Sequence, residues 1–457
     1  MTLQRLQAKQ TGLLGPVSFG AGVLLLVLVP IFRAGNRYVP LIGLEWLALL
    51  VLWLLAMRSL AGSPTLANRR DVAPLGIGEW LLVLSPLWAA LLFLTPLPMA
   101  FWAGLPGHAA YPSAPGVGWR SLSLTPDATV ASLLAGILPV TGFMLARTAT
   151  SAQLRTLATV WVLLALLQSV WGLLQAGPFK ELGFGVSVDA AGGVIGSFGG
   201  RNNFANFIAM ALPLAILMLW RSLPGVGRAQ SRRSMWVTAL WSLALLVLAA
   251  AVLASLSRAG TVAAIVVSLL TVLLLLNTVA KPHRRWYALG AAVLVVLAVL
   301  ISAGVMTLIA RFEDDALTQG VAGRWQLTES SWQAAQAFWP TGSGPGSFAN
   351  VYPQFQPPGM LASIEHAHND YVELLMEFGA LFVVVAALAA GLIARQAIWL
   401  WHQASRVSRM PGSLQLQLCC ALGLLAVLLH SWVDYNFRIP ANATLAACLL
   451  GAFLRRK

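Results

Sequence analysis

Apolar residues run in long stretches along almost the whole chain, and charged residues, Gly and Pro separate one stretch from the next. Each stretch holds about 20 residues, the number that an α-helix needs to cross the hydrocarbon core of a bilayer. The pattern predicts spans near residues 13–32, 40–57, 77–97, 128–146, 156–176, 202–220, 235–256, 260–277, 286–310, 371–394, 414–432 and 439–454. We therefore expect an all-α polytopic membrane protein of about 12 transmembrane helices.

The longest segment without a spanning run is 311–370. It contains a set of residues at helical spacing, which predicts an amphipathic helix lying on the membrane surface: Trp325, Trp332, Ala335 and Trp339. A Gly-rich turn and an irregular loop follow this helix. The chain then divides into four parts, which are N-terminal spans (1–194), spans with arginine motifs (195–310), a helical and loop segment (311–370) and C-terminal spans (371–457).

Composition supports a membrane protein, because 58% of the residues are hydrophobic and only 10% are charged. So few charged residues cannot cover one globular core in water. The formal net charge of +14 comes from small clusters between apolar runs, so we expect no nucleic-acid partner. The three cysteines lie inside apolar runs without metal-ligand spacing and are interpreted as small core residues.

An even number of spans places both termini on one side of the membrane. Most of the 29 lysines and arginines then fall in segments on the same side as the termini. The positive-inside rule makes that side the cytoplasm. Segment 311–370 then faces outward, so the functional site is expected there.

Nine basic residues stand against this charge bias on the predicted outer side, and three of them are candidates for a function: Arg201, Arg258 and Arg324. Arg258 lies between two apolar runs, where a charge costs about 2.5–3.5 kcal/mol unless it has a partner or snorkels to headgroups. Arg201 opens a span beside Asn203, which indicates either a helix cap or an anion site at a helix start. Arg324 follows an acidic run, so a surface ion pair is the alternative to a functional role.

The stretch EHAHNDYVELLMEFG, residues 365–379, places many polar groups where an outer loop meets a span. Its supporting polar residues are Asn369, Asp370, Glu373 and Glu377. The three acids share one helix face through spacings of three and four, while His368 is expected to project from the outer end of the helix. A structural histidine and a metal site with His366 are the alternatives, although the i, i+4 pair of a zinc helix is missing.

Another polar stretch, HSWVDYNFRIPANA, lies between the last two predicted spans. It holds Asp434 and Arg438 four residues apart, and we interpret them as an ion pair that ties the two spans together. The glycines of GSGPGS, residues 342–347, are interpreted as turn residues, because no Gly-Lys-Ser/Thr follows them.

These motifs, in this order, resemble the O-antigen ligase superfamily of bacterial envelope enzymes. The resemblance covers about residues 195–445 and rests on RNNFANFIAMALPLAI, LSRAG, GRW, P-x-G-x-G-x-G-x-F, HAHNDYVELLMEFG and HSWVDYNFRIPANA. It implies a GT-C-like fold in the bacterial inner membrane, with cytoplasmic termini and a periplasmic active site. The first half of the chain shows no comparable match.

The resemblance implies an inverting glycosyltransferase that needs neither metal nor other cofactor. Its donor would be an undecaprenyl-diphosphate-linked glycan, and its acceptor the lipid A core or a growing glycan. Arg258 and Arg324 would bind the diphosphate and take part in catalysis with His368, while Arg201 and Asn203 would contact the donor diphosphate or sugar. O-antigen ligation is the first hypothesis, followed by a polymerase of the same superfamily, a protein O-oligosaccharyltransferase and a secondary transporter.

Overall fold

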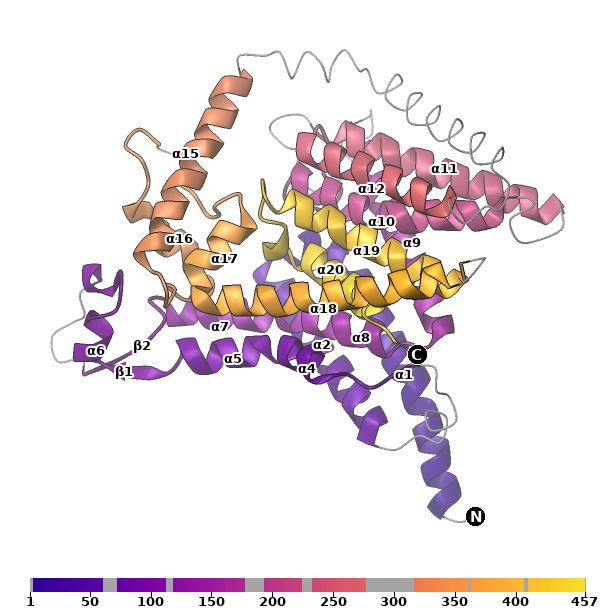
Figure 1. Cartoon of the computed structure of the whole chain (residues 1–457), viewed down its shortest axis with the longest axis horizontal. Helices are drawn as coiled ribbons and strands as arrows, with labels where there is room; N and C mark the ends of the chain where they lie inside the picture. The colour runs from indigo at the N-terminus through magenta and orange to yellow at the C-terminus, as the bar shows by residue number, and fades with distance from the viewer. Residues whose placement is uncertain are drawn as a thin grey trace.

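The computed structural model describes residues 3–60, 72–111, 118–176, 193–223, 232–276, 316–360, 363–406 and 410–456. The longer helices are α1 (Leu3–Ile31), α2 (Tyr38–Leu60), α7 (Pro126–Ala135), α8 (Ile137–Thr148), α9 (Ser151–Ala176), α10 (Arg201–Ser222), α11 (Arg232–Ala254), α12 (Arg258–Leu276), α15 (Ala316–Ala337), α18 (Ala380–Ser405), α19 (Gly412–His430) and α20 (Pro440–Phe453). Shorter helices are α4 (Ile77–Val83), α5 (Ser85–Phe93), α6 (Met99–Ala103), α16 (Phe348–Val351) and α17 (Asp370–Phe378). The fold is therefore a helical bundle (Figure 1).

Short 3-10 turns complete the path of the chain: η1 (Arg33–Gly35), η2 (His108–Ala110), η4 (Tyr352–Gln354) and η5 (Asn436–Arg438). Strands β1 (Pro96–Pro98) and β2 (Trp119–Ser121) pair antiparallel, with Leu97 opposite Arg120. This small hairpin lies beside α6, at the same end of the molecule as α15, α16 and α17 (Figure 1).

Within the described ranges, nine helical segments are long and apolar enough to cross a membrane. They are 13–31, 38–60, 126–148, 151–175, 201–222, 235–254, 258–276, 380–405 and 412–430. Each of these segments overlaps a span predicted from the apolar runs. The prediction of a polytopic all-α membrane protein is confirmed, whereas the count of about 12 spans and the GT-C-like class stay predictions.

The three other predicted spans have different outcomes. Within the span predicted at 77–97, the chain forms two short helices, α4 and α5, which meet at Leu84 just before Pro86 and end at Phe93. Pro favours a helix start and lacks the N–H that would continue the preceding helix. Residues 440–453 form the shorter apolar helix α20, and the span predicted at 286–310 lies outside the described residues.

The span predicted at 371–394 begins later than expected. Gly379 adopts a φ of 54°, which ends α17 and separates it from α18. A left-handed conformation interrupts a right-handed helix, and glycine adopts it without a steric penalty. The acids of α17 thus lie outside the membrane-spanning segment that starts at Ala380.

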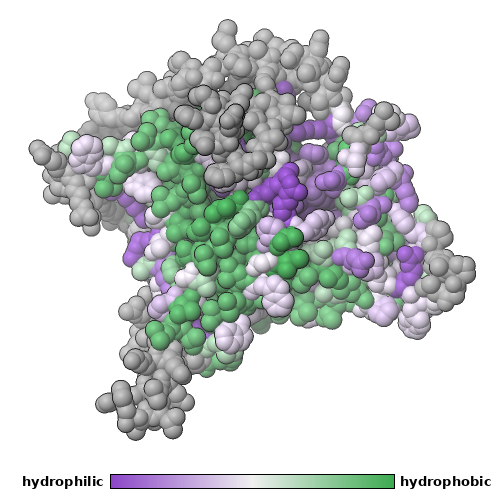
Figure 2. All heavy atoms as spheres, turned by 180° about the vertical axis from the view of Figure 1, so that it is seen from behind, coloured by the Kyte–Doolittle hydropathy of each residue, from purple (hydrophilic) through white to green (hydrophobic). Residues whose placement is uncertain are grey.

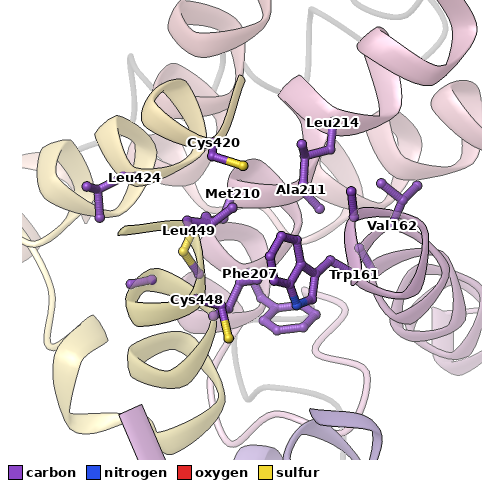
Figure 3. Close-up of a cluster of buried hydrophobic side chains, with 14 of the residues drawn as sticks. Trp161, Val162, Phe207, Met210, Ala211, Leu214, Cys420, Leu424, Cys448 and Leu449 are labelled. Atoms are coloured by element: carbon purple, nitrogen blue, oxygen red, sulfur yellow. The ribbon is translucent and has the colours of Figure 1, made fainter. Parts of the chain in front are cut away.

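The core is built around α10, whose residues from Asn203 to Leu217 are all buried. Figure 3 shows Phe207, Met210 and Ala211 of α10 among side chains of α9, α19 and α20. Helices α10 and α19 approach each other closely at Gly423, which has no side chain. A Cβ at this position would lie only 2.5 Å from the Met210 carbonyl oxygen. Cys419, Cys420 and Cys448 are free and buried in this core, which confirms their interpretation as core residues.

The outside of the bundle is apolar. Large hydrophobic side chains are exposed on its outer helices, among them Leu163 of α9, Leu240 of α11 and Val384 of α18. In Figure 2 hydrophobic residues form a broad area over the middle of the molecule, while hydrophilic ones gather on the right and at the upper centre. Such an exposed apolar surface suits the lipid phase of a bilayer.

At one end of the bundle, α15 packs on α17 and shares a small core with α16 and α6 (Figure 1). The structure confirms a helix here, and this helix covers residues 316–337. Ala335 is buried with Phe338, whereas Trp325 and Trp332 are exposed on the side of the helix. Trp339 lies beyond the end of α15, and the position of this helix on the membrane surface stays a prediction.

Candidate functional site

The candidate site forms around α17 and the turn between α19 and α20, residues 431–439, here called the α19–α20 turn. Asn369 caps α17, because its Oδ1 accepts hydrogen bonds from the backbone N–H groups of Tyr371 (3.1 Å) and Val372 (3.2 Å). Asp370, Glu373 and Glu377 follow at spacings of three and four residues, and all three are buried. The predicted acidic face thus exists, but it points into the protein.

Arg438 of the α19–α20 turn binds two of these acids. Its Nε lies 2.9 Å from Glu373 Oε1, and its Nη2 pairs with Glu377. Burial disfavours the charged guanidinium, yet Glu377 and Glu373 raise the pKa of Arg438 above its ordinary value. The expected ion pair between Arg438 and Asp434 is wrong, since Asp434 faces His368 instead.

Glu373 also holds the first histidine of the motif. His366 Nδ1 lies 2.9 Å from Glu373 Oε1, and the His366 ring stacks on Tyr435 with 4.2 Å between centroids. Burial opposes the charged imidazole, but the hydrogen bond to Glu373 outweighs it and raises the pKa of His366. Burial likewise opposes ionisation of Glu373, while Arg438 and His366 bring its pKa below the ordinary value. His366 is thus a partner of a buried ion pair.

His368 occupies a different position from His366. Its side chain is 34% exposed, and its Nδ1 lies 3.2 Å from Oδ1 of the buried Asp434. The ring also meets Tyr435 edge-on, with 4.9 Å between centroids. The backbone of His368 has a φ of 49°, an uncommon conformation for a non-glycine residue that requires support from its surroundings.

Asp434 is the anionic partner of His368. Burial alone raises the pKa of a carboxyl group, but His368, His430 and the Tyr435 N–H together bring the pKa of Asp434 below its ordinary value. The pair therefore brings an imidazole within ion-pair distance of a buried carboxylate. A carboxylate at such a distance is one way in which proteins orient a histidine that exchanges protons.

Asp370 connects α17 to the α19–α20 turn through the backbone. Its N–H donates to the Ser431 carbonyl oxygen (3.0 Å), and its Oδ2 accepts from the Phe437 N–H (3.0 Å). Burial raises the pKa of Asp370 to about 7, against the opposing effect of the Phe437 hydrogen bond. Asp370 therefore fixes the position of the turn that carries Asp434.

The Gly-rich turn lies at the other end of α17. The N–H groups of Ser343 and Gly344 donate to the carbonyl oxygens of Met376 (3.0 Å) and Glu377 (2.9 Å), and the Phe348 N–H donates to Glu377 Oε1 (3.2 Å). These bonds satisfy backbone oxygens that a helix end leaves unpaired. The glycines serve turn geometry and close packing, as the sequence predicts.

Asn203 joins α10 to the α19–α20 turn. Its Nδ2 donates to Asn436 Oδ1 (3.4 Å), and its carbonyl oxygen accepts from Asn442 Nδ2 (3.0 Å). Arg201, the first residue of α10, is half-buried two positions before Asn203. The start of α10 and the α19–α20 turn thus lie side by side.

Arg258 is the first residue of α12 and is half-buried. The starts of α12 and α10 are adjacent, because a Cβ on Gly193 would lie 2.3 Å from the Ser255 oxygen and 3.2 Å from Arg201 Cδ. Arg258 and Arg201 thus lie at neighbouring helix starts. Asn203, two residues after Arg201, connects the start of α10 to the α19–α20 turn.

Arg324 lies on α15, is exposed and has Tyr435 and His430 within electrostatic range. No hydrogen bond or ion pair of Arg324 with the α19–α20 turn is present among the described residues, so its place in the site stays a prediction. Among the described residues, no group of three or more His, Cys, Asp and Glu side chains is arranged to hold a metal ion. His366 and His368 each face one carboxylate, Glu373 and Asp434 respectively.

The sequence pattern led us to interpret Asp434 and Arg438 only as an ion pair, and it assigned no role in the site to His430 or Tyr435. The signal was present as the density of polar residues in HSWVDYNFRIPANA. Their partners lie on α17 and in the loop before it, far away in the sequence, and helical spacing within the α19–α20 turn gives no indication of them.

A sequence model described as the O-antigen ligase family (Wzy_C) matches residues 243–387. The matched region contains Arg258, Arg324, His368 and the acids of α17, and it ends before the α19–α20 turn. A search of curated proteins finds no match to the chain.

Proposed function

We propose that the chain is an inverting, metal-independent glycosyltransferase of the O-antigen ligase superfamily that uses an undecaprenyl-diphosphate-linked glycan. The general activity of the family is of the O-antigen ligase or polymerase type. Our first candidate is ligation of O-antigen to lipid A core at the periplasmic face of the inner membrane, with both termini in the cytoplasm.

The observation that carries this proposal is the pairing of His368 with Asp434. The acceptor hydroxyl needs a base close to neutral pH, and an imidazole with an ordinary pKa of about 6.5 meets this need. Asp434 lies 3.2 Å from Nδ1 and is expected to fix the ring and stabilise the imidazolium that forms. The side chain of His368 is 34% exposed, so a substrate can reach it.

The proposed step is a single displacement at the anomeric carbon of the donor. His368 Nε2 takes the proton of the acceptor hydroxyl while its oxygen forms a bond to the anomeric carbon. The bond from that carbon to the phosphate oxygen breaks, and the electron pair leaves with the undecaprenyl diphosphate. Attack from the opposite side inverts the configuration.

Guanidinium groups suit the leaving group, because they bind phosphate oxygens bidentately and stabilise developing negative charge. Arg324, within electrostatic range of the α19–α20 turn, is assigned to this role with Arg258. Arg201 and Asn203 at the start of α10 are assigned to the donor diphosphate or sugar. The acids of α17 support the site by holding Arg438 and His366.

The direct test is transfer by the purified protein from a synthetic undecaprenyl-diphosphate glycan, with lipid A core, free glycan or a peptide offered as acceptor. Transfer to lipid A core supports the ligase, transfer to free glycan the polymerase, and transfer to peptide the protein O-oligosaccharyltransferase. Solute uptake into proteoliposomes without any transfer would overturn the enzyme proposal in favour of a transporter.

Variants test the residues. His368→Ala and Arg324→Ala are expected to abolish transfer while the protein still inserts and folds, whereas Arg395→Ala, an exposed arginine on α18, retains it. Full activity in both site variants would contradict the assignment. Activity that a chelator stops and a divalent metal restores would contradict the metal-independent mechanism.

A deletion strain separates the two family activities. Loss of ligation leaves long chains on the lipid carrier, while loss of polymerisation leaves single repeat units on the core. The second pattern would replace the ligase by the polymerase as the proposed function.

A further inference from the structure

Helix α9 carries two glutamines within its membrane-spanning part, Gln168 and Gln175. They are seven residues apart, so they lie on the same side of the helix, and their side chains are buried, with residue exposures of 0% and 2%. Polar side chains inside a membrane span are costly unless they have partners within the protein. The partners of both glutamines lie mainly in one short piece of chain before α10, the buried residues 193–198, here called segment 193–198.

Both glutamines bind the backbone of this segment. Gln175 Nε2 donates to the Gly196 carbonyl oxygen (2.7 Å), and Gln175 Oε1 accepts from the Ile195 N–H (3.4 Å). Gln168 Oε1 accepts from the N–H (3.0 Å) and from the Oγ (2.9 Å) of Ser197. The two side chains thus pair with backbone groups of three consecutive residues.

The segment needs such partners because it is buried but not helical. Its backbone groups cannot pair along the chain as those of a helix do, and a buried backbone group without a partner is costly. A glutamine amide offers both donors and an acceptor, so it suits both kinds of backbone group. The packing is close, since a Cβ on Gly196 would lie 2.7 Å from Gln168 Oε1. Gln168 Nε2 also donates to the Pro30 carbonyl oxygen of α1 (3.3 Å).

Segment 193–198 lies between the starts of α10 and α12. The Val194 N–H donates to the Ala254 carbonyl oxygen (3.1 Å), four residues before Arg258. At its other end the segment leads directly into α10, which begins with Arg201. The segment therefore determines how the two arginines lie relative to each other.

We propose that Gln168 and Gln175 are positioning residues, which hold segment 193–198 and thereby align Arg201 and Arg258 for the diphosphate of the donor. This inference rests on the proposed function, in which both arginines bind that diphosphate. The glutamines act through the segment, because both are enclosed by the protein.

The inference predicts an effect on the donor and not on the acceptor. The proposed base for the acceptor hydroxyl, His368, is held by Asp434 of the α19–α20 turn. Neither residue contacts segment 193–198 through a hydrogen bond or ion pair among the described residues. A loss of either glutamine should therefore weaken donor binding while the acceptor binds as before.

The experiment measures transfer by the full-length protein from a synthetic undecaprenyl-diphosphate glycan, with donor and acceptor concentrations varied separately. Gln168→Leu and Gln175→Leu keep much of the side-chain volume but remove the amide, which leaves buried backbone groups unpaired. Each is expected to raise the KM for the donor about tenfold and to leave the KM for the acceptor within about twofold of the wild type. The Kd for undecaprenyl diphosphate alone, measured without transfer, should rise with the donor KM.

Ser169→Ala is the matched control. Ser169 lies beside Gln168 on α9 and is equally buried, but its Oγ donates to the Ala165 carbonyl oxygen of the same helix (2.8 Å). This variant should leave the KM values and the Kd unchanged. Gln168→Asn and Gln175→Asn keep the amide on a shorter side chain and should show a smaller rise in donor KM than the leucine variants.

Thermal unfolding in detergent shows which variants are folded. An unchanged donor KM in the folded leucine variants, or an equal rise for donor and acceptor, would overturn the inference. If the leucine variants do not fold, an unchanged donor KM in the asparagine variants overturns it in the same way. A wild type that transfers no glycan would instead overturn the proposed function, and since the other outcomes require an active wild type, the two failures are distinguishable.

Discussion

Arg438 reaches from the α19–α20 turn to Glu373 of α17, with 2.9 Å between its Nε and Oε1 of the carboxylate. The same guanidinium pairs with Glu377 one turn further along α17. Both carboxylates are buried, so water cannot solvate them if the arginine is removed. The contact joins the segment that carries His368 to the segment that carries Asp434.

We therefore predict that Arg438→Ala lowers the free energy of unfolding by about 3–5 kcal/mol, because it leaves uncompensated charge in the interior. The measurement is thermal or denaturant unfolding in detergent. Arg37→Ala, at an exposed arginine near the end of α1, is the control and should unfold like the wild type. A variant in which Arg438→Met is combined with Glu373→Gln and Glu377→Gln should recover stability, and equal stability of Arg438→Ala and wild type would contradict the prediction.

A second prediction concerns the pair of His368 and Asp434. Asp434→Asn should reduce the transfer rate by about 100-fold or more, since it removes the charge that stabilises the imidazolium. In a His368→Ala background the same change should have little further effect, because Asp434 acts through His368.

The control for this pair is Asp127→Asn, at an exposed carboxylate on α7, which should leave the rate unchanged. Additive losses in the double variant would show that Asp434 contributes independently of His368. The residual transfer of the four proteins in the cycle, followed over long incubation at high enzyme concentration, decides between these outcomes.

Much of the fold could be predicted from the sequence, because a membrane helix needs only length and apolar composition. The positions of the nine spans found in the described ranges follow from their apolar runs. The shared face of Asp370, Glu373 and Glu377 follows from spacing, since residues three and four apart are neighbours on a helix. These are local properties, and local patterns determine them.

The partners within the site depend on tertiary structure and could not be predicted in this way. Asp434 and Arg438 are four residues apart, which would make them neighbours on an α-helix. The chain instead forms the 3-10 turn η5 from Asn436 to Arg438, so Asp434 faces His368 while Arg438 faces α17. The break between α17 and α18 at Gly379 could not be predicted either, because a single Gly is tolerated in many helices.

A third prediction uses the pKa of Asp370, which burial raises to about 7 from 3.8. Between these two values the folded protein keeps a proton that the unfolded chain releases. The folded state therefore loses stability as the pH rises through this window. Asp370→Asn imitates the neutral acid and should lose this dependence.

The measurement is the difference in Tm between Asp370→Asn and wild type, followed from acidic to neutral pH. His366 and Glu373 titrate in both proteins, so their effects largely cancel in the difference. The variant should gain Tm relative to the wild type as the pH rises toward 7. A difference that stays constant with pH would rule out Asp370 as the titrating group.

The last prediction tests the packing of the Gly-rich turn against α17. Gly344 has a φ of 109°, and a Cβ there would lie 2.2 Å from Ser123 Oγ, whereas Gly359 has a φ of 92° and nothing within 4 Å. Both positions strain an alanine backbone, but only Gly344→Ala also forces a neighbouring segment to move. Gly344→Ala should therefore lose about 1–3 kcal/mol more of unfolding free energy than Gly359→Ala. The Gly344 N–H also donates to the Glu377 carbonyl oxygen at the end of α17, so Gly344→Ala should lose transfer activity as well. Equal losses of stability in the two variants would show that backbone strain alone causes the loss.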